Sequence, residues 1–255
     1  MRNTILLMLT FIVFSTVASS QNLKVIYRCS RSISFADQLE SDKKRNPHAA
    51  NFIDQMHKYA EQVDAYAIDF KLEQAGQVSN FEMIPDGNDG ISTWNYETGS
   101  FSYSLVTKDD QCYKNLAASN LVLTRSRNKI EYCVKDHLFD FCWNIQTDSK
   151  KIIGYTAYKA IGTYQGREIT AWFTPDIPIS NGPLEYGGLP GLILELEIWD
   201  NPSVFKAIEL EISKDNTPDI TPAYCRAPKQ YTINEMWIEN DRIKNRNRKM
   251  AKSKK

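Results

Sequence analysis

Residues that build metal sites are scarce in this sequence of 255 residues. Its three histidines, His48, His57 and His137, form no His-x-x-x-His or Glu-x-x-His pattern, so a metal site on a helix is not expected. The nearest cluster is Cys133-x3-His137-x4-Cys142, which supplies only three soft ligands at a spacing typical of no zinc site. We therefore expect no metal, and we interpret these cysteines as structural or as a hairpin disulfide.

Motifs of hydrolases and nucleotide-binding enzymes are also absent. Gly-x-Ser-x-Gly does not occur, and no Walker loop is present because no Lys-Ser or Lys-Thr pair follows the glycines of residues 182–191. Glu195 and Glu197 would share one face of a strand, where paired carboxylates can act as acid and base, but the solvent face of an ordinary strand has the same pattern. We therefore expect no catalytic residue and no cofactor. The alternative, an enzyme, requires Glu195, Glu197, His137 or the cysteines to converge in a pocket with shifted pKa values.

Long apolar runs are missing after the first twenty residues. Arg2, the apolar run Ile5–Val13 and the small residues Ala18–Ser20 are typical of a secretory signal peptide over residues 1–20. No later stretch reaches the ~18 apolar residues of a spanning helix. We therefore expect a soluble exported protein of the periplasm or outer envelope. One β-rich domain is expected over residues 21–230, followed by a C-terminal helix and basic tail over residues 231–255.

Charge is balanced overall but unevenly placed. The chain has 31 basic and 31 acidic residues, whereas Arg242–Lys255 contains eight basic residues and no acidic one. Such a tail is either a solvated chain end or a segment attracted to an anionic membrane surface or lipopolysaccharide. Nucleic acid is not expected as the partner of an exported chain.

Five cysteines lie after the expected signal peptide, and the odd number leaves one thiol over. Export would allow disulfides. Cys133 and Cys142 flank an expected hairpin turn at residues 135–138 and could face each other across two strands. The connectivity stays open among Cys29, Cys112, Cys133, Cys142 and Cys225.

Period-two alternation of apolar residues predicts many short strands in close succession. The clearest hairpin joins Lys151–Tyr164 to Arg167–Thr174 through the tight turn Gln165-Gly166. A dense turn cluster at residues 85–90 introduces an expected exposed loop up to residue 99, and Ser30–Arg45 looks polar and irregular. The other expected strands are Leu23–Cys29, Tyr66–Glu73, Val78–Ile84, Ser100–Val106, Gln111–Asn115, Leu121–Arg125, Lys129–Val134, Phe139–Gln146, Leu192–Trp199 and Ser203–Ile212.

Two helices are expected beside these strands. Asn46-Pro47 is a good helix start, and apolar residues at helical spacing then extend to Val63. Thr232 and Glu235 form a capping box at the start of a helix that ends near Arg248. We predict an α+β, mainly β fold, in which a curved antiparallel sheet, an open half-barrel, cups the first helix, with a C-terminal helix added.

The stretch Asn181–Trp199, NGPLEYGGLPGLILELEIW, is the most distinctive in the chain. Glycine permits positive φ and close approach of backbones, and proline fixes φ, so we predict a rigid loop that leads into a half-buried strand. Gly191→Val should unfold the protein if the backbone there has positive φ or closely approaches another strand.

The hexapeptide 188–193, GLPGLI, resembles the signature of the GLPGLI family, a group of uncharacterised exported proteins of Gram-negative bacteria. Residues 151–160 and 171–178 resemble two further family segments, although Ala157 stands where many relatives carry cysteine. The resemblance implies a structural role for Gly154, Tyr155, Lys159, Trp172, Pro178, Gly182, Pro183, Tyr186, Gly188, Leu189, Pro190, Gly191, Leu192 and Ile193. The expected shape is similar to the lipoprotein-carrier (LolA/LolB-like) half-barrel, which is an analogy of shape and not of function.

These observations favour a non-enzymatic envelope protein that binds an apolar or amphipathic ligand, such as a lipid chain or a peptide segment, in the concavity of the sheet. Its ligand-binding residues cannot be named from the sequence. The alternative is a structural or assembly partner of an outer-membrane transporter or protease, which predicts a filled concavity without a ligand.

Overall fold

The computed structural model describes residues 22–85, 93–95, 100–102, 110–127, 130–198, 203–214, 217–222 and 229–252. The expected signal peptide, the turn cluster at residues 86–90, Trp199 and Cys225 lie outside the described residues. So do residues 103–106 of one expected strand and the last three residues of the basic tail.

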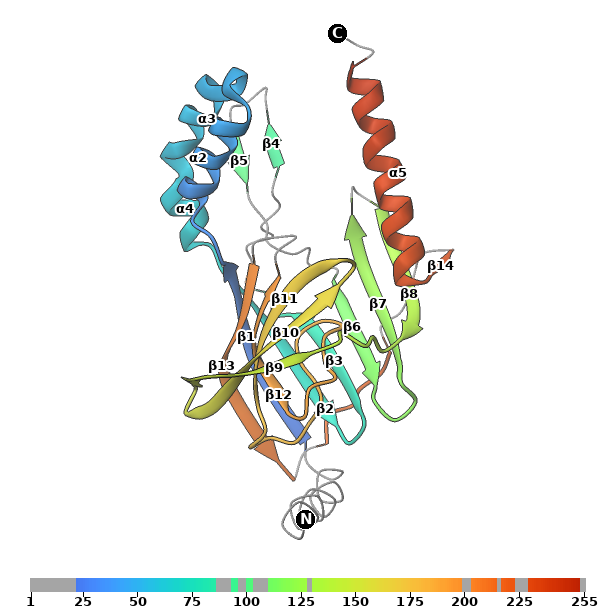
Figure 1. Ribbon diagram of the computed structural model, residues 1–255. Coiled ribbons are helices and arrows are strands. Elements are labelled where there is room, and N and C mark those ends of the chain that lie inside the picture. Colours follow the sequence, from blue (N-terminus) through green and yellow to red (C-terminus); the bar gives the residue numbers. More distant parts are fainter. Residues whose placement is uncertain are drawn as a thin grey trace, which may run out of the picture.

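One large sheet of twelve strands dominates the fold (Figure 1). The strand order is β14-β8-β7-β6-β3-β2-β1-β13-β12-β11-β10-β9, so β14 and β9 form the two edges and the sheet stays open. Every neighbouring pair is antiparallel except β14 and β8. The predicted fold class, mainly β with a large curved open sheet, is confirmed. The strands are β1 Asn22–Arg31, β2 Ile68–Ala75, β3 Val78–Met83, β6 Gln111–Asn115, β7 Asn120–Arg127, β8 Ile130–His137, β9 Asn144–Ile152, β10 Tyr155–Tyr164, β11 Arg167–Thr174, β12 Leu192–Ile198, β13 Ser203–Ser213 and β14 Gln230–Tyr231.

Alternating side chains give the sheet an inner and an outer face. On β2, Ile68, Phe70 and Leu72 are buried, whereas the intervening Asp69 and Lys71 are only partly covered. The Phe70 and Phe81 rings stack inside the curve with centroids 5.2 Å apart. This period-two pattern is the signal that located most strands in the sequence.

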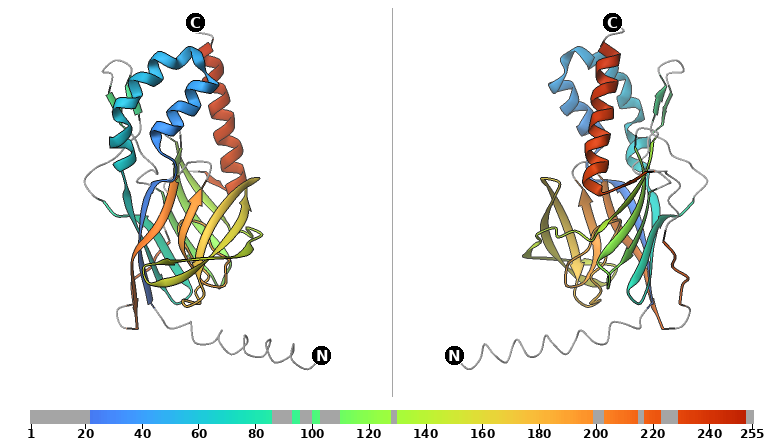
Figure 2. Two further views of the ribbon diagram at one scale, coloured as in Figure 1. Left: turned by 60° about the vertical axis from the view of Figure 1, so that its left-hand side comes forward. Right: turned by 90° about the vertical axis from the view of Figure 1, so that its right-hand side faces the viewer.

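A helical region stands at one end of the sheet, beside the small sheet of β4 (Thr93–Asn95) and β5 (Ser100–Ser102) (Figures 1 and 2). It consists of α2 Phe35–Arg45, α3 Ala50–Met56 and α4 Ala60–Ala65, with short 3-10 turns η3 Pro47–Ala49 and η4 His57–Tyr59. The apolar residues of these helices form a cluster of their own, separate from the main core: Phe35, Leu39, Ile53, Met56, Ala60 and Val63.

The helical region corrects two details of the sequence interpretation. The helix expected over residues 47–63 is broken by η4, and its apolar stripe packs against α2 instead of lying in the concavity of the sheet. The stretch expected to be irregular, Ser30–Arg45, contains the end of β1 and all of α2. Helix α2 has only two buried residues, Phe35 and Leu39, which is too few to give a periodic signal.

Helix α5 (Ile233–Lys252) begins next to β14, and its other end points away from the sheet (Figure 1). The capping box is confirmed: the Thr232 N–H donates to Glu235 Oε2 at 2.8 Å, and the Glu235 N–H donates to Thr232 Oγ1 at 3.3 Å. The Thr232 N–H and hydroxyl both donate to the Glu235 carboxylate, and these two hydrogen bonds lower the pKa of the Glu235 carboxyl. Met236 and Ile243 of α5 are buried, and Trp237 is partly buried.

Segment 138–143 corrects another expectation. The strand expected at Phe139–Gln146 begins only at Asn144. In the preceding residues the Phe141 side chain is buried in the core at 1% exposed, whereas Asp140 and Cys142 are exposed. The long arm expected at Lys151–Tyr164 is split by a turn at Ile153-Gly154, where both residues have positive φ. The turn at Gln165-Gly166 is confirmed.

The prediction of a hairpin disulfide between Cys133 and Cys142 is wrong, because Cys142 has a free, exposed thiol and β8 pairs with β7 and β14 instead.

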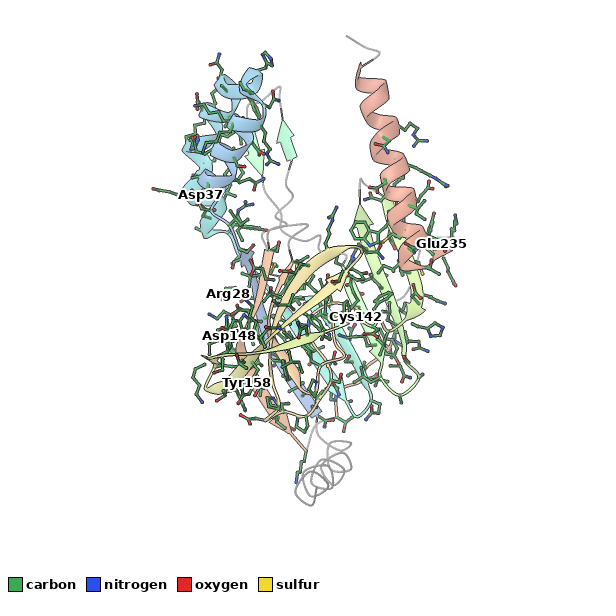
Figure 3. All side chains as sticks on the ribbon, viewed as in Figure 1. Arg28, Asp37, Cys142, Asp148, Tyr158 and Glu235 are labelled. Carbon is green, nitrogen blue, oxygen red and sulfur yellow. The ribbon has the colours of Figure 1, made fainter. Side chains whose placement is uncertain are left out.

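The concavity of the sheet holds a segment of the chain itself, residues 175–191, which we call the inner loop. Its side chains Ile177, Ile179, Leu184, Tyr186 and Leu189 are each at most 5% exposed and belong to the main core cluster. The loop leads directly into β12, as expected. Side chains crowd the space enclosed by the strands (Figure 3).

Candidate functional site

The inner loop is held by polar groups that the strands direct into the curve of the sheet. On β6 the side chains of Cys112 and Lys114 both point inward, and on β7 the inward positions are Leu121, Leu123 and Arg125. A lysine and an arginine thus occupy positions where the alternation calls for apolar residues. Because a buried charge is costly unless it is paired and hydrogen-bonded, the partners of these two cations define the site.

Lys114 is 1% exposed and binds the backbone of the inner loop. Its Nζ donates to the carbonyl oxygens of Gly182 at 2.8 Å and Tyr186 at 2.9 Å. Burial lowers the pKa of Lys114 to about 8, although Cys112 and Glu185 act in the opposite direction. Burial also raises the pKa of the neighbouring Cys112 thiol to about 12, so this thiol is not an activated nucleophile.

Arg125 forms a buried two-pronged pair with Glu185 at the turn of the inner loop. Its Nη1 and Nη2 donate to Glu185 Oε1 and Oε2 at 3.2 and 2.8 Å, and its Nε lies 3.6 Å from Asp110 Oδ2. Burial disfavours the guanidinium, but Glu185 and Asp110 outweigh it and raise the Arg125 pKa. The Tyr164 hydroxyl donates to Glu185 Oε1 at 3.3 Å. Two carboxylates therefore flank the buried Arg125 guanidinium, and the Tyr164 hydroxyl binds one of them.

Asn181 provides a third attachment of the inner loop to the sheet. Its Nδ2 donates to Gln74 Oε1 at 2.6 Å and to Ser79 Oγ at 2.9 Å, which connects the loop to β2 and β3. Its backbone carbonyl accepts from the Ile193 N–H at 2.9 Å. From β1, the buried Tyr27 hydroxyl donates to the Ile193 carbonyl at 2.6 Å. The loop is thus bonded to strands far apart in the sequence.

The glycines of the inner loop allow these close contacts. A Cβ at Gly191 would lie 2.1 Å from the Thr174 carbonyl oxygen, and one at Gly182 would lie 2.8 Å from Ile193 Cβ. The close approach on which the Gly191→Val prediction depends is therefore present, whereas Gly191 does not have positive φ. Gly188 is the loop glycine with positive φ, at +85°.

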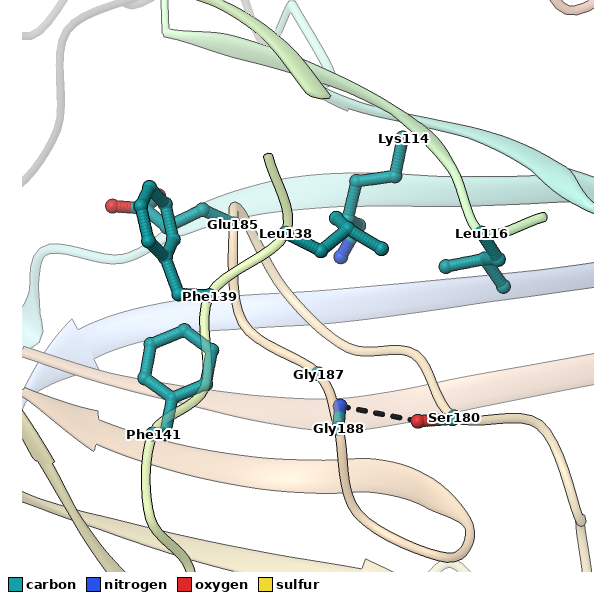
Figure 4. Close-up of a pocket in the computed structure, with 9 residues that line it drawn as sticks. All are labelled: Lys114, Leu116, Leu138, Phe139, Phe141, Ser180, Glu185, Gly187 and Gly188. Atoms are coloured by element: carbon teal, nitrogen blue, oxygen red, sulfur yellow. Dashed lines mark hydrogen bonds between the residues drawn. The ribbon is translucent and has the colours of Figure 1, made fainter. Parts of the chain in front are cut away.

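A small pocket opens between the inner loop and segment 138–143 (Figure 4). Its volume is about 140 Å³. The Gly188 N–H donates to Ser180 Oγ at 3.1 Å across one side, and the Trp143 indole N–H donates to the Gly187 carbonyl at 2.8 Å nearby. The lining residues are Lys114, Leu116, Leu138, Phe139, Phe141, Ser180, Glu185, Gly187 and Gly188.

The expected family-motif residues fall into two groups. Most belong to the inner loop and the start of β12, and those that are buried there are Gly182, Pro183, Tyr186, Leu189, Gly191, Leu192 and Ile193. Gly188 and Pro190 lie on the surface of the same loop, as does Pro178. The others, Gly154, Tyr155, Lys159 and Trp172, lie on β10, on β11 and at the turn before β10.

Three of the residues named for the enzyme alternative lie in different parts of the described sheet. Glu195 lies on the outer face, where Lys150 Nζ donates to it at 2.6 Å and also sits 4.1 Å from the Trp172 ring centroid. His137 is exposed at the end of β8, and Cys29 is buried on β1. Among the described residues, no group of three or more histidine, cysteine or acidic side chains is placed to hold a metal ion.

Lys114, Arg125 and Glu185 were not predicted from the sequence. The sequence did contain a signal for the two cations, because Lys114 and Arg125 occupy inward positions of β6 and β7, and both residues lay within predicted strands. A cation at such a position implies a buried partner. No sequence pattern could identify Glu185 as that partner, since 60 residues separate it from Arg125.

Comparison with known protein families identifies only a short stretch of this chain, which includes the GLPGLI hexapeptide. Residues 163–195 match the model of a family described as "Protein of unknown function (Porph_ging)". The likeness to the GLPGLI family and to lipoprotein carriers stays a prediction. No curated protein matches this chain. In the part of the chain that the structure describes, no helix is long and apolar enough to cross a membrane.

Two solved structures of PNGF-II resemble this chain. The one in space group C2 is 14% identical with a TM-score of 0.46, and the matched region covers 76% of this chain and 28% of the PNGF-II chain. The one in space group P21 is 12% identical with a TM-score of 0.48, and the matched region covers 86% of this chain and 33% of the PNGF-II chain. This chain thus spans about a third of those chains or less.

Proposed function

We propose that this protein is an exported, non-enzymatic component of the cell envelope that serves as a structural or assembly partner of another protein, such as an outer-membrane transporter or protease. The observation that carries the proposal is the inner loop. A carrier of lipid or of an amphipathic segment needs an apolar concavity open to its cargo. Here the corresponding space is occupied by residues 175–191, tied to the strands by Lys114, Asn181 and the pair Arg125–Glu185.

The buried polar groups support a fixed loop rather than a lid. Opening the loop would expose the Arg125–Glu185 pair and the Lys114 ammonium, and it would separate partners that are bonded at 2.8–3.2 Å. Breaking a buried ion pair of this kind typically costs about 3–5 kcal/mol, which exceeds what binding of a small cargo readily supplies. The outer surface and the helical region are therefore the parts left for a partner.

The C-terminal basic segment supports a second element of the proposal, contact with an anionic membrane surface. Arg242 and Arg246 are exposed on α5, and the sequence from Arg242 onward contains eight basic residues and no acidic one. We expect binding to vesicles that contain anionic lipid but not to purely zwitterionic ones, and loss of binding at high salt. A variant with Arg242, Lys244 and Arg246 changed to glutamine should bind less, whereas changing Lys24, Lys206 and Lys214, which lie on β1, on β13 and just after β13, should have no effect.

The proposal is tested by chemical cross-linking in the native envelope, followed by affinity purification and native mass spectrometry. The expected result is a defined complex with one other protein and a mass for the released subunit that contains no lipid. A monomer that carries a bound acyl lipid after purification would contradict the proposal.

The second candidate function, binding of an apolar or amphipathic ligand in the concavity, is favoured only by the residual pocket of about 140 Å³. That volume is comparable with engineered cavities of about 150 Å³ that hold benzene, and it is too small for an acyl chain. This candidate predicts that lipid extracts shift the melting temperature of the purified protein.

A further inference from the structure

The pocket beside the inner loop has an exposed rim and a buried floor. Ser180 and Gly188 at the rim are exposed, whereas Lys114, Phe141 and Glu185 are each at most 2% exposed. The lining comes from three separate segments: the end of β6, segment 138–143 and the inner loop (Figure 4). The pocket therefore reaches from the surface to the polar groups that hold the inner loop.

Lys114 has hydrogen-bonding capacity that the inner loop does not use. A lysine ammonium has three N–H donors. Two of them bind the carbonyls of Gly182 and Tyr186, and the described residues provide no acceptor for the third. Since Lys114 lines the pocket, an acceptor atom in the pocket can take this third donor.

The charge of Glu185 limits the charge that a ligand in the pocket can carry. Its carboxylate already accepts from Arg125 and from the Tyr164 hydroxyl. Lys114 and Arg125 are balanced by Glu185 and Asp110, so the buried cluster is neutral as a whole. A ligand carboxylate would add an uncompensated buried charge, whereas an uncharged carbonyl or hydroxyl oxygen would not.

Apolar side chains form the rest of the wall. Leu116, Leu138, Phe139 and Phe141 line the space, whose volume suits a body the size of one small ring. The Phe139 and Phe141 rings are 6.1 Å apart in a T-shaped arrangement, and Phe141 stacks on Tyr186 at 5.1 Å, so these rings are held in place by their neighbours.

We propose that this pocket binds a small, largely apolar group that carries one uncharged acceptor oxygen, and that this oxygen accepts the third N–H of Lys114. The group belongs either to a free small molecule or to a side chain of a partner protein. The inference goes beyond the proposed function, because it concerns a site that a purely structural protein would not need.

The test uses cyclopentanone, cyclopentane and cyclopentanecarboxylate as probes, which share one ring and differ in the acceptor and the charge. Binding is followed by ¹H–¹⁵N chemical shifts of the Ser180, Gly187 and Gly188 amides in the full protein. Cyclopentanone should shift these amides saturably and bind at least about tenfold more tightly than cyclopentane, because a bond to a charged donor is gained. It should also bind more tightly than the carboxylate.

A pocket-filling variant avoids the risk of unfolding that a change at Lys114 carries. Leu138→Trp should abolish the cyclopentanone shifts, since Leu138 lines the pocket but makes none of the polar contacts of the loop. The matched control, Ile130→Trp on β8, changes a side chain that is 38% exposed and should leave binding unchanged. The proposal is overturned if cyclopentane and cyclopentanone bind with equal affinity, or if cyclopentanecarboxylate binds more tightly than cyclopentanone. It is also overturned if no probe gives a saturable shift, because the pocket then holds water only.

Displacement experiments then distinguish the two sources of the natural group. Displacement of cyclopentanone by the dialysable fraction of an envelope extract assigns a free molecule. Displacement by the retained protein fraction assigns a partner side chain. If neither fraction displaces the probe, the pocket has no natural occupant and the proposal is wrong.

Discussion

The inner loop with its sheet and the helical region are stabilised in different ways. The inner loop is joined to four strands, β2, β3, β6 and β7, through buried polar bonds and lies within one large apolar cluster. The helical region has six buried apolar residues, and its ion pairs, such as Lys43–Asp54 and Arg45–Asp42, are exposed to solvent. Surface ion pairs contribute little to stability, so the two regions should differ greatly in their resistance to local opening.

The largest effect is expected at Gly191. Changing Gly191 to alanine places a Cβ 2.1 Å from the Thr174 carbonyl, a backbone atom that cannot move without separating the inner loop from β11. We expect loss of the folded state, measured by circular dichroism and thermal unfolding. The matched control is Gly154→Ala, where φ is +87° but nothing lies within 4 Å of the new Cβ. That variant should lose only about 1 kcal/mol of unfolding free energy.

Breaking the buried pair should have the next largest effect. Glu185→Gln leaves the Arg125 guanidinium with less compensation and should lower the free energy of unfolding by about 3–5 kcal/mol in urea denaturation. Glu195→Gln removes a carboxylate from a partly exposed pair with Lys150 and should cost at most about 1 kcal/mol. If the two variants were equally stable, the buried pair would not be what holds the inner loop.

A cavity in the helical region should have a smaller and local effect. Ile53→Ala should destabilise α2 to α4 by about 2–4 kcal/mol, because a buried isoleucine is truncated. Since this cluster is separate from the main core, we expect faster amide exchange in the helices while the melting temperature of the sheet stays almost unchanged. Leu72→Ala in the sheet should instead lower the melting temperature of the whole molecule. A global loss from Ile53→Ala would show that the two regions unfold together.

The smallest predicted effect concerns the pH dependence of Lys114. Its folded pKa of about 8 lies below the unfolded value, so the folded state binds fewer protons from pH 8 to about 10.5, and stability from this group rises with pH in that window. The destabilisation caused by Lys114→Met should therefore grow by about 1 kcal/mol between pH 7 and pH 9. Comparing the variant with the parent protein cancels the opposing contributions of the buried thiols Cys29 and Cys112. A difference that does not change with pH would contradict a buried, charged Lys114.

Local patterns were enough to predict most of the sheet. Alternation located β2, β6 and β13, and turn chemistry located the hairpin at Gln165-Gly166. Residues 139–143 were wrongly predicted as strand, since Phe139, Phe141 and Trp143 alternate along the chain while packing in or against the core. Helix α2 was missed because only Phe35 and Leu39 are buried, and the site was missed because its partners meet only after folding.

Native-state hydrogen exchange tests most directly the claim that the inner loop is part of the core. The Leu192 N–H donates to the Ile177 carbonyl at 3.0 Å, and the Ile193 N–H donates to the Asn181 carbonyl at 2.9 Å. The Tyr186 N–H donates to the Pro183 carbonyl at 3.1 Å. If the loop permanently fills the concavity, these three amides exchange only through global unfolding, as slowly as those of β1 and β2. Exchange of these amides as fast as in α3, with the sheet still protected, would mean that the loop opens and that the concavity is available to a ligand.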